Sequence, residues 1–124
     1  MTTLVLILVT VAVSLLCFNG TLDANALKFN AYGIWHRGQW HRMLTYGLVH
    51  GGWGHLLFNM LTLYFFGTVV ERYFAAAFGS TSGIILYVLL YVSALAVSTV
   101  GDLLKNKSNP YYSAVGASGA VSAV

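Results

Sequence analysis

Charged residues are scarce in this chain. Asp, Glu, Lys and Arg make up 7% of its 124 residues, against about 25% in an average soluble domain. Hydrophobic residues make up 58%, and the mean hydropathy is +0.76. This composition excludes an ordinary soluble domain and indicates a small integral membrane protein. The six Lys and Arg residues give a net charge of +3, but they are too few and too scattered to form a nucleic-acid-binding surface.

Cysteine is nearly absent as well. Cys17 is the single cysteine and lies inside an apolar run, so the chain can form neither an internal disulfide nor a thiolate metal site from it alone. The four histidines are spaced by five or more residues and lack carboxylate or thiolate partners, which argues against a metal site. No segment repeats at a fixed period. We therefore expect a single domain, residues 1–124, with no metal and no cofactor.

Three apolar stretches are candidates for membrane crossings. Residues 4–18 fall short of the roughly 20 residues expected for a transmembrane helix. A signal peptide is an alternative for this stretch, although the Lys or Arg that normally precedes one is missing. Residues 54–72 would span about 28 Å as a helix, which fits a hydrocarbon core of about 30 Å. Residues 80–100 are the third candidate, after an expected tight link at 73–79 and before an expected polar loop at 102–109.

A fourth apolar segment begins at residue 114 and stops too soon. The nine residues from Gly116 onward reach only about 13 Å as a helix, which cannot cross a bilayer. We therefore expect an all-α, polytopic transmembrane helix bundle that is truncated early in its fourth helix and incomplete at the C-terminus.

The stretch 27–53 differs in composition from the apolar stretches. It interleaves aromatic side chains such as Trp35 and Trp40 with basic ones such as Arg37 and Arg42. Such residues are typical of the membrane–water interface. The stretch is too long for a bare turn and too polar to span. We expect a structured interfacial loop, partly embedded in the bilayer.

Polar side chains lie at the starts of two apolar segments. His50, His55 and Asn59 lead into the second one, and Ser118 lies near the start of the fourth. Because polar side chains at membrane depth are costly, they indicate a functional site by default. Counting crossings puts both groups at the same membrane face. His55 and Asn59 are four residues apart and share one face of a helix.

Ser118 lies between small residues, in the tetrapeptide 116–119. At a helix N-terminus it would have free backbone N–H groups nearby, and such groups can bind a developing oxyanion. Each group also has a structural alternative. Small residues allow close helix packing in lipid, and His55 with Asn59 would serve as an interhelical hydrogen-bonding pair.

Taken together, these residues and their spacing resemble the rhomboid family of intramembrane serine proteases. The matching positions include Trp40, Arg42, His50, His55, Asn59, Glu71, Gly116, Ser118 and Gly119. The resemblance implies six or more transmembrane helices around a water-filled cavity that opens to the exoplasmic side. It further implies cleavage of other membrane proteins in or near their transmembrane segments, with the lipid bilayer as the medium and without metal or nucleotide.

The resemblance also implies a role for each matching residue. Ser118 would be the nucleophile, and His55 and Asn59 would stabilise the oxyanion, with His50 supporting the same pocket. The remaining positions would be structural: Trp40 and Arg42 in the large first loop, Glu71 at the inner end of the second helix, and Gly116 and Gly119 around the serine. The family's general base is a histidine on the sixth helix, which lies beyond residue 124, so the chain alone is expected to be inactive.

Two other functions fit part of the pattern. A non-catalytic rhomboid-like protein would bind transmembrane helices of client proteins without cutting them. A small transporter or channel would line a polar path with His50 and His55. The charge bias conflicts with an exoplasmic site, because the Lys and Arg residues gather on the His/Ser side, which the positive-inside rule would make cytoplasmic. The sequence indicates neither the oligomeric state nor the substrate.

Overall fold

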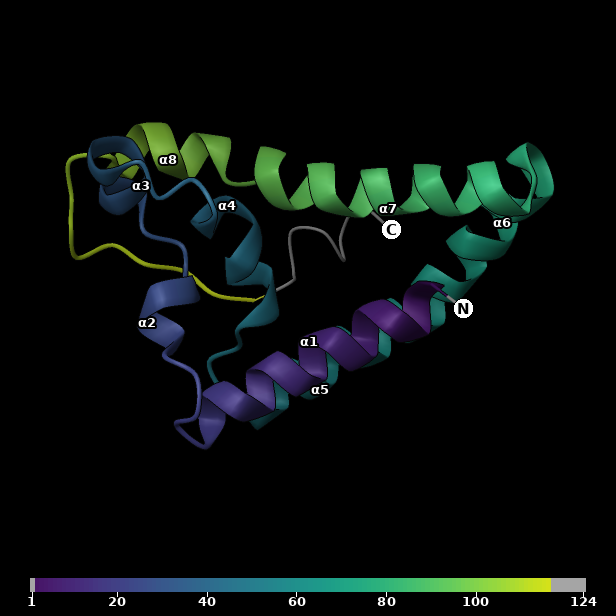
Figure 1. Cartoon of the computed structure of the whole chain (residues 1–124), viewed down its shortest axis with the longest axis horizontal. Coiled ribbons are helices and arrows are strands. Elements are labelled where there is room, and N and C mark those ends of the chain that lie inside the picture. Colours follow the sequence, from purple (N-terminus) through teal and green to yellow (C-terminus); the bar gives the residue numbers. More distant parts are fainter. Residues whose placement is uncertain (1, 117–124) are drawn as a thin grey trace.

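The computed structural model describes residues 2–116. Within this range the chain is helical, as the sequence predicts, and contains no strand beyond an isolated bridge between Phe29 and Ala114. Three long helical segments dominate the fold (Figure 1): α1 (Thr2–Phe18), the run from α5 to α6, and α7 (Ser80–Val97). The α5–α6 run is unbroken and consists of α5 (Trp53–Thr62), a π-helical segment η2 (Leu63–Gly67) and α6 (Thr68–Phe78).

The long helices form an open wedge. α1 lies along α5, α7 runs above them, and α7 meets α6 at a tight hairpin (Figure 1). Close packing at the hairpin requires Gly83, because a Cβ there would lie 2.8 Å from the Phe74 backbone. The short helices α2 (Ala24–Leu27), α3 (Ala31–Arg37) and α4 (Arg42–Thr45) lie at the wide end of the wedge.

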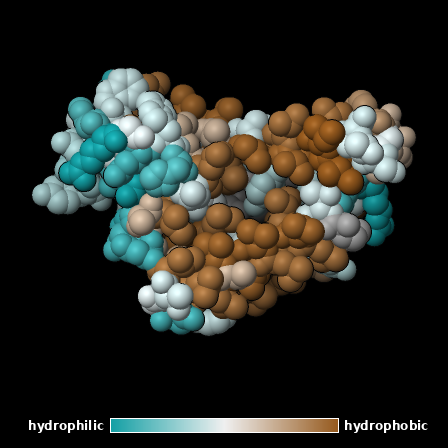
Figure 2. Space-filling model, in the orientation of Figure 1, coloured by the Kyte–Doolittle hydropathy of each residue, from teal (hydrophilic) through white to brown (hydrophobic). Residues whose placement is uncertain are grey.

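Within residues 2–116, two helices are long and apolar enough to cross a bilayer: Trp53–Phe78, with 26 residues, and Ser80–Asn106, with 27. α1 is apolar but has only 17 residues. Figure 2 shows hydrophobic surface over the long helices, with hydrophilic side chains gathered mainly at the two ends of the long axis. The surface therefore has the polarity pattern of a protein that lies across a membrane.

Two predicted connections are wrong. The link expected at 73–79 is helical through Phe78. Only Gly79, with φ of 87°, separates α6 from α7. The segment contains three consecutive alanines, which favour a helix. Much of the loop expected at 102–109 is also helical, in α8 (Val100–Asn106). α8 buries Leu103 in the core and packs against α3, so tertiary packing outweighs the local polarity.

The first loop, residues 19–52 between α1 and α5, is structured as expected. Asn30 caps α3 by accepting a hydrogen bond from the Gly33 N–H at 2.8 Å. Gly38 ends α3 in the left-handed conformation, with φ of 66°. Lys107, just after α8, holds its Nζ 4.5 Å from the centroid of the Trp35 ring. The loop is therefore packed against α8 rather than hanging free.

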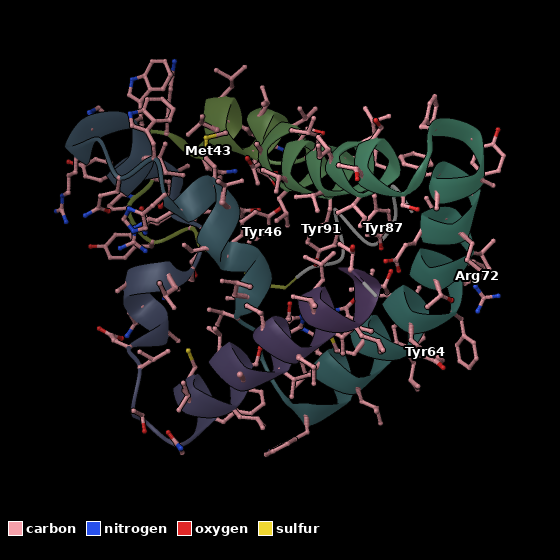
Figure 3. All side chains as sticks on the ribbon, turned by 45° about the vertical axis from the view of Figure 1, so that its right-hand side comes forward. Met43, Tyr46, Tyr64, Arg72, Tyr87 and Tyr91 are labelled. Carbon is pink, nitrogen blue, oxygen red and sulfur yellow. The ribbon has the colours of Figure 1, made fainter. Side chains whose placement is uncertain are left out.

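Tyrosines of α7 face the inside of the wedge. Figure 3 shows Tyr87 and Tyr91 pointing from α7 toward α1, whereas Tyr64 and Arg72 point outward from the α5–α6 run. Tyr46 is in the 3₁₀ turn η1 (Tyr46–Leu48), which precedes α5. Its hydroxyl donates a hydrogen bond to the carbonyl of Leu95 on α7, at 2.9 Å. The first loop is thus tied to α7 as well as to α8.

Glu71 ties the start of α1 to α6. Its carboxylate accepts hydrogen bonds from the backbone N–H groups of Thr2 and Thr3 and, at 2.8 Å, from the Thr3 hydroxyl. The Thr3 hydroxyl also lies 3.0 Å from the hydroxyl of Tyr87. One carboxylate therefore joins α1 and α6 directly and reaches α7 through Thr3.

We expect Glu71→Gln to lower the free energy of unfolding by about 1–3 kcal/mol, because a neutral amide accepts these bonds less well than a carboxylate. Thermal denaturation of the full-length protein in detergent measures the loss. Arg72→Gln, at the exposed neighbouring position, is the matched control and should leave the midpoint unchanged. Equal midpoints for the two variants would contradict this role of Glu71.

Candidate functional site

His50 is buried between η1 and α5, with 3% of its surface exposed. Its Nδ1 lies 3.1 Å from the hydroxyl oxygen of Ser14 on α1. The Ser14 hydroxyl donates to the carbonyl of Leu48 at 2.7 Å. Burial, and to a smaller extent the neighbouring His55, lowers the pKa of His50 from 6.5 to about 4. His50 is therefore neutral at pH 7.

The low pKa of His50 predicts a loss of stability in acid. The unfolded chain takes up a proton at His50 near pH 6.5, whereas the folded chain does so only near pH 4. Between these values the unfolded state binds more protons, so the free energy of unfolding falls as the pH falls, by up to about 3 kcal/mol. Thermal denaturation in detergent at neutral pH and near pH 4 measures the change. His50→Gln should flatten this dependence relative to His36→Gln, at an exposed position; identical pH dependences would refute the assignment.

His55 and Asn59 follow on α5. The His55 ring lies against that of His50, with centroids 5.0 Å apart and planes at 65°. Asn59 is one helical turn further and only 4% exposed. Its Nδ2 is buried and has no hydrogen-bond partner within residues 2–116. Because buried polar atoms are nearly always paired, this amide is an unusual donor within residues 2–116.

The chain returns to these residues at 114–116. Ala114 exchanges two backbone hydrogen bonds with Phe29, at 2.8 and 3.1 Å, and the Gly116 N–H donates to the Tyr46 carbonyl at 2.9 Å. Gly116 has φ of 104°, and a Cβ there would lie 2.6 Å from His55 Cε1. The Gly116 backbone therefore lies directly against the His55 imidazole. Ser118 and Gly119 lie outside the described residues.

Of the two predicted loop residues, Arg42 is anchored and Trp40 is exposed. Arg42 Nη1 donates to the carbonyls of Asn25 and Lys28, at 2.7 and 2.9 Å. Its Nε donates to the side chain of Gln39 at 2.8 Å. Trp40 is 54% exposed. Arg42 thus holds α2 and α4 together, whereas the Trp40 side chain is at the surface.

Ser14 contacts the candidate site, although the sequence does not single it out. The available signal was weak, because Ser14 is one of only two polar interruptions of the apolar stretch 4–18. Its contact with His50 spans 36 residues of sequence and becomes visible only when α1 packs against η1. Within the described part of the chain, no three His, Cys, Asp or Glu side chains gather as a metal site would require.

Comparison with known proteins places the chain in a family. The profile of the Rhomboid domain matches residues 37–124. The chain is similar to Rhomboid protease GluP of Bacillus subtilis (strain 168), with 38% identity over 101 residues that cover 82% of this chain and 17% of GluP. It is also similar to RHOMBOID-like protein 12, mitochondrial, of Arabidopsis thaliana, with 32% identity over 96 residues that cover 70% of this chain and 28% of the relative.

The chain thus spans less than a third of the length of each of these relatives. No solved structure matches the chain significantly. The family profile covers most of the chain, including all of the site positions expected from the sequence. This chain therefore belongs to the rhomboid family, and its two long apolar helices indicate an integral membrane protein.

Proposed function

We propose that this chain is part of a rhomboid-type intramembrane serine endopeptidase, with residues 1–124 forming an incomplete, multi-pass rhomboid-like domain. Its substrates are transmembrane proteins within the lipid bilayer. Ser118 attacks the scissile carbonyl and forms a tetrahedral oxyanion. Collapse of this intermediate expels the amine and leaves an acyl-enzyme ester, which water hydrolyses. The general base is a histidine beyond residue 124, and the site faces the exoplasmic side, as the family resemblance implies.

The contact between Gly116 and His55 carries the proposal. Two residues of extended chain span at most about 7 Å, so covalent geometry keeps the Cα of Ser118 within that distance of Gly116. Gly116 in turn lies against the His55 ring. A hydroxyl at position 118 is therefore confined to the neighbourhood of the His55 ring.

The buried amide of Asn59 is suited to oxyanion stabilisation. Its Nδ2 has no hydrogen-bond partner within residues 2–116, and an unpaired buried donor costs about 1–3 kcal/mol. A developing oxyanion would satisfy that donor only as the transition state forms, which is the condition for rate acceleration. His55 supplies a second donor from its ring, and His50 supports the same pocket. Arg42 and Trp40 shape the first loop beside it.

Labelling and cleavage together test the proposal. The full-length protein, reconstituted in liposomes with a reporter transmembrane substrate, is treated with a serine-reactive fluorophosphonate. We expect the probe to attach to Ser118 and to block cleavage in proportion to labelling. A protein that binds the substrate helix, leaves it uncut and escapes the probe would instead be the non-catalytic helix-binding relative, and the protease assignment would fail.

A further inference from the structure

We propose that Ser14 on α1 is a positioning residue for this site: it holds His50 in the tautomer that carries its proton on Nδ1. In this form His50 presents an acceptor nitrogen, Nε2, and supports catalysis through His55 rather than by donating to the oxyanion. The role in catalysis rests on the proposed function, whereas the tautomer of His50 does not.

The tautomer follows from counting protons. A serine hydroxyl has a single proton to donate, and the Leu48 carbonyl, 2.7 Å away, can only accept it. The Ser14 oxygen is then left to accept at its other contact, which is His50 Nδ1 at 3.1 Å. A neutral imidazole has one donor and one acceptor nitrogen. Nδ1 is therefore the donor of His50, and Nε2 is its acceptor.

Burial of the contact favours the tautomer of His50 that is protonated on Nδ1 over the opposite tautomer. Ser14 is fully buried, with 0% exposed, and His50 is 3% exposed, so bulk water does not compete for either group at their contact. In the opposite tautomer, Nδ1 of His50 would carry no proton. It would face the Ser14 hydroxyl, whose own proton is already donated to the Leu48 carbonyl. Two acceptors would then face each other in a buried site, at a cost of about 1–3 kcal/mol.

The face of α1 provides independent support. The three buried residues of α1 all carry hydroxyl groups: Thr3, Thr10 and Ser14. Their spacings of seven and four residues place them on one side of the helix. α1 therefore turns a polar stripe inward, flanked by apolar side chains such as Leu6 and Leu15 that pack against the core. Thr3 joins Glu71, Thr10 donates to Leu6 of its own helix, and Ser14 alone of the three contacts the candidate site.

Contacts then lead from α1 to the reacting region. Ser14 fixes the His50 ring, the His50 ring packs edge-to-face against that of His55, and the His55 ring abuts Gly116. If the His50 ring rotated or shifted, the His55 ring packed against it would move as well. The donor nitrogen of His55 would then be displaced relative to Ser118. Misplacement of a catalytic group by about 1 Å can cost a hundredfold in rate.

Kinetics of three variants of the full-length protein test the positioning role. We expect Ser14→Ala to lower kcat by about tenfold to a hundredfold with KM unchanged, because an interaction that serves the transition state is lost. Ser14→Thr keeps the hydroxyl and should recover most of the activity. Thr10→Val is the matched control, since Thr10 is equally buried on the same helix and its hydroxyl donates to the Leu6 carbonyl of α1 rather than to the candidate site. It should retain wild-type kcat.

The tautomer has its own readout, which needs no activity. In the protein labelled with ¹⁵N-histidine, the signal that disappears in His50→Gln reports His50. We expect a protonated Nδ1 in the wild type and a shift toward protonated Nε2 in Ser14→Ala. A wild-type signal from protonated Nε2 would overturn the inference even if Ser14→Ala fails to fold.

The failure of this inference is distinguishable from failure of the proposed function. If cleavage requires Ser118 but Ser14→Ala matches Thr10→Val in kcat, the positioning role is wrong and the protease assignment survives. If cleavage does not require Ser118, the protease assignment and the catalytic role of Ser14 both fall, while the ¹⁵N signals still decide the tautomer.

Discussion

Replacing Ser118 with Ala is expected to abolish cleavage of a reporter transmembrane substrate by the full-length protein. Removal of a serine nucleophile lowers kcat by on the order of a millionfold in a hydrolase whose catalytic groups act as a unit. The change removes a single oxygen, so expression and the thermal midpoint should remain those of the wild type. Quantification of the cleaved and uncut substrate in proteoliposomes measures the effect.

Ser113→Ala is the control for this experiment, because Ser113 lies on the same segment and is exposed. It should cleave at the wild-type rate. Cleavage that persists in Ser118→Ala would remove the serine mechanism altogether. Substrate that is still captured by Ser118→Ala, but not cut, would show that the helix-binding surface is separate from the chemistry.

The second large effect is expected at Gly116. Gly116→Ala should lower cleavage by about a hundredfold, for two reasons that act together. The backbone has φ of 104°, which strains any residue with a Cβ, by about 1–3 kcal/mol. The added methyl would also lie 2.6 Å from His55 Cε1, so the imidazole must move. Steady-state cleavage, compared with the thermal midpoint, separates the local effect from global unfolding.

Two other glycines, Gly20 and Gly101, provide control variants for Gly116→Ala. Gly20 also has a positive φ, 82°, but a Cβ there meets nothing within 4 Å, so Gly20→Ala carries backbone strain without a clash. Gly101 lies in α8, and a Cβ there meets nothing within 4 Å, so Gly101→Ala carries neither. We expect both variants to cleave at the wild-type rate. A loss in Gly20→Ala equal to that in Gly116→Ala would assign the effect to backbone strain instead of to His55.

The sequence predicts helix identity better than helix ends. The apolar run from residue 54 to 72 predicts the second helix, because a bilayer core requires about 20 apolar residues. It does not reveal that the helix continues to Phe78, since the end is set by the positive φ of Gly79. The helical character of 100–106 depends on burying Leu103 against the rest of the fold, which no local pattern encodes.

Some features of the candidate site could be predicted from the sequence, and others could not. His55 and Asn59 could be grouped from sequence because a four-residue spacing places them on one face of α5. Counting crossings was enough to expect the segment around Ser118 at that face. The contact between Gly116 and His55 could not be predicted, because it depends on a left-handed backbone and on the Tyr46 carbonyl. The Ser14 contact depends on packing between elements far apart in sequence.

The paired hydrogen bonds between Phe29 and Ala114 couple two distant parts of the chain. Through them, the first loop and the stretch at 114–116 are held together. The hydrogen bond from the Gly116 N–H to the Tyr46 carbonyl adds a second attachment between the two. Any tilt of that loop carries Ala114 with it. The contact between Gly116 and the His55 imidazole thus depends on how a loop is seated that contributes neither of these two residues.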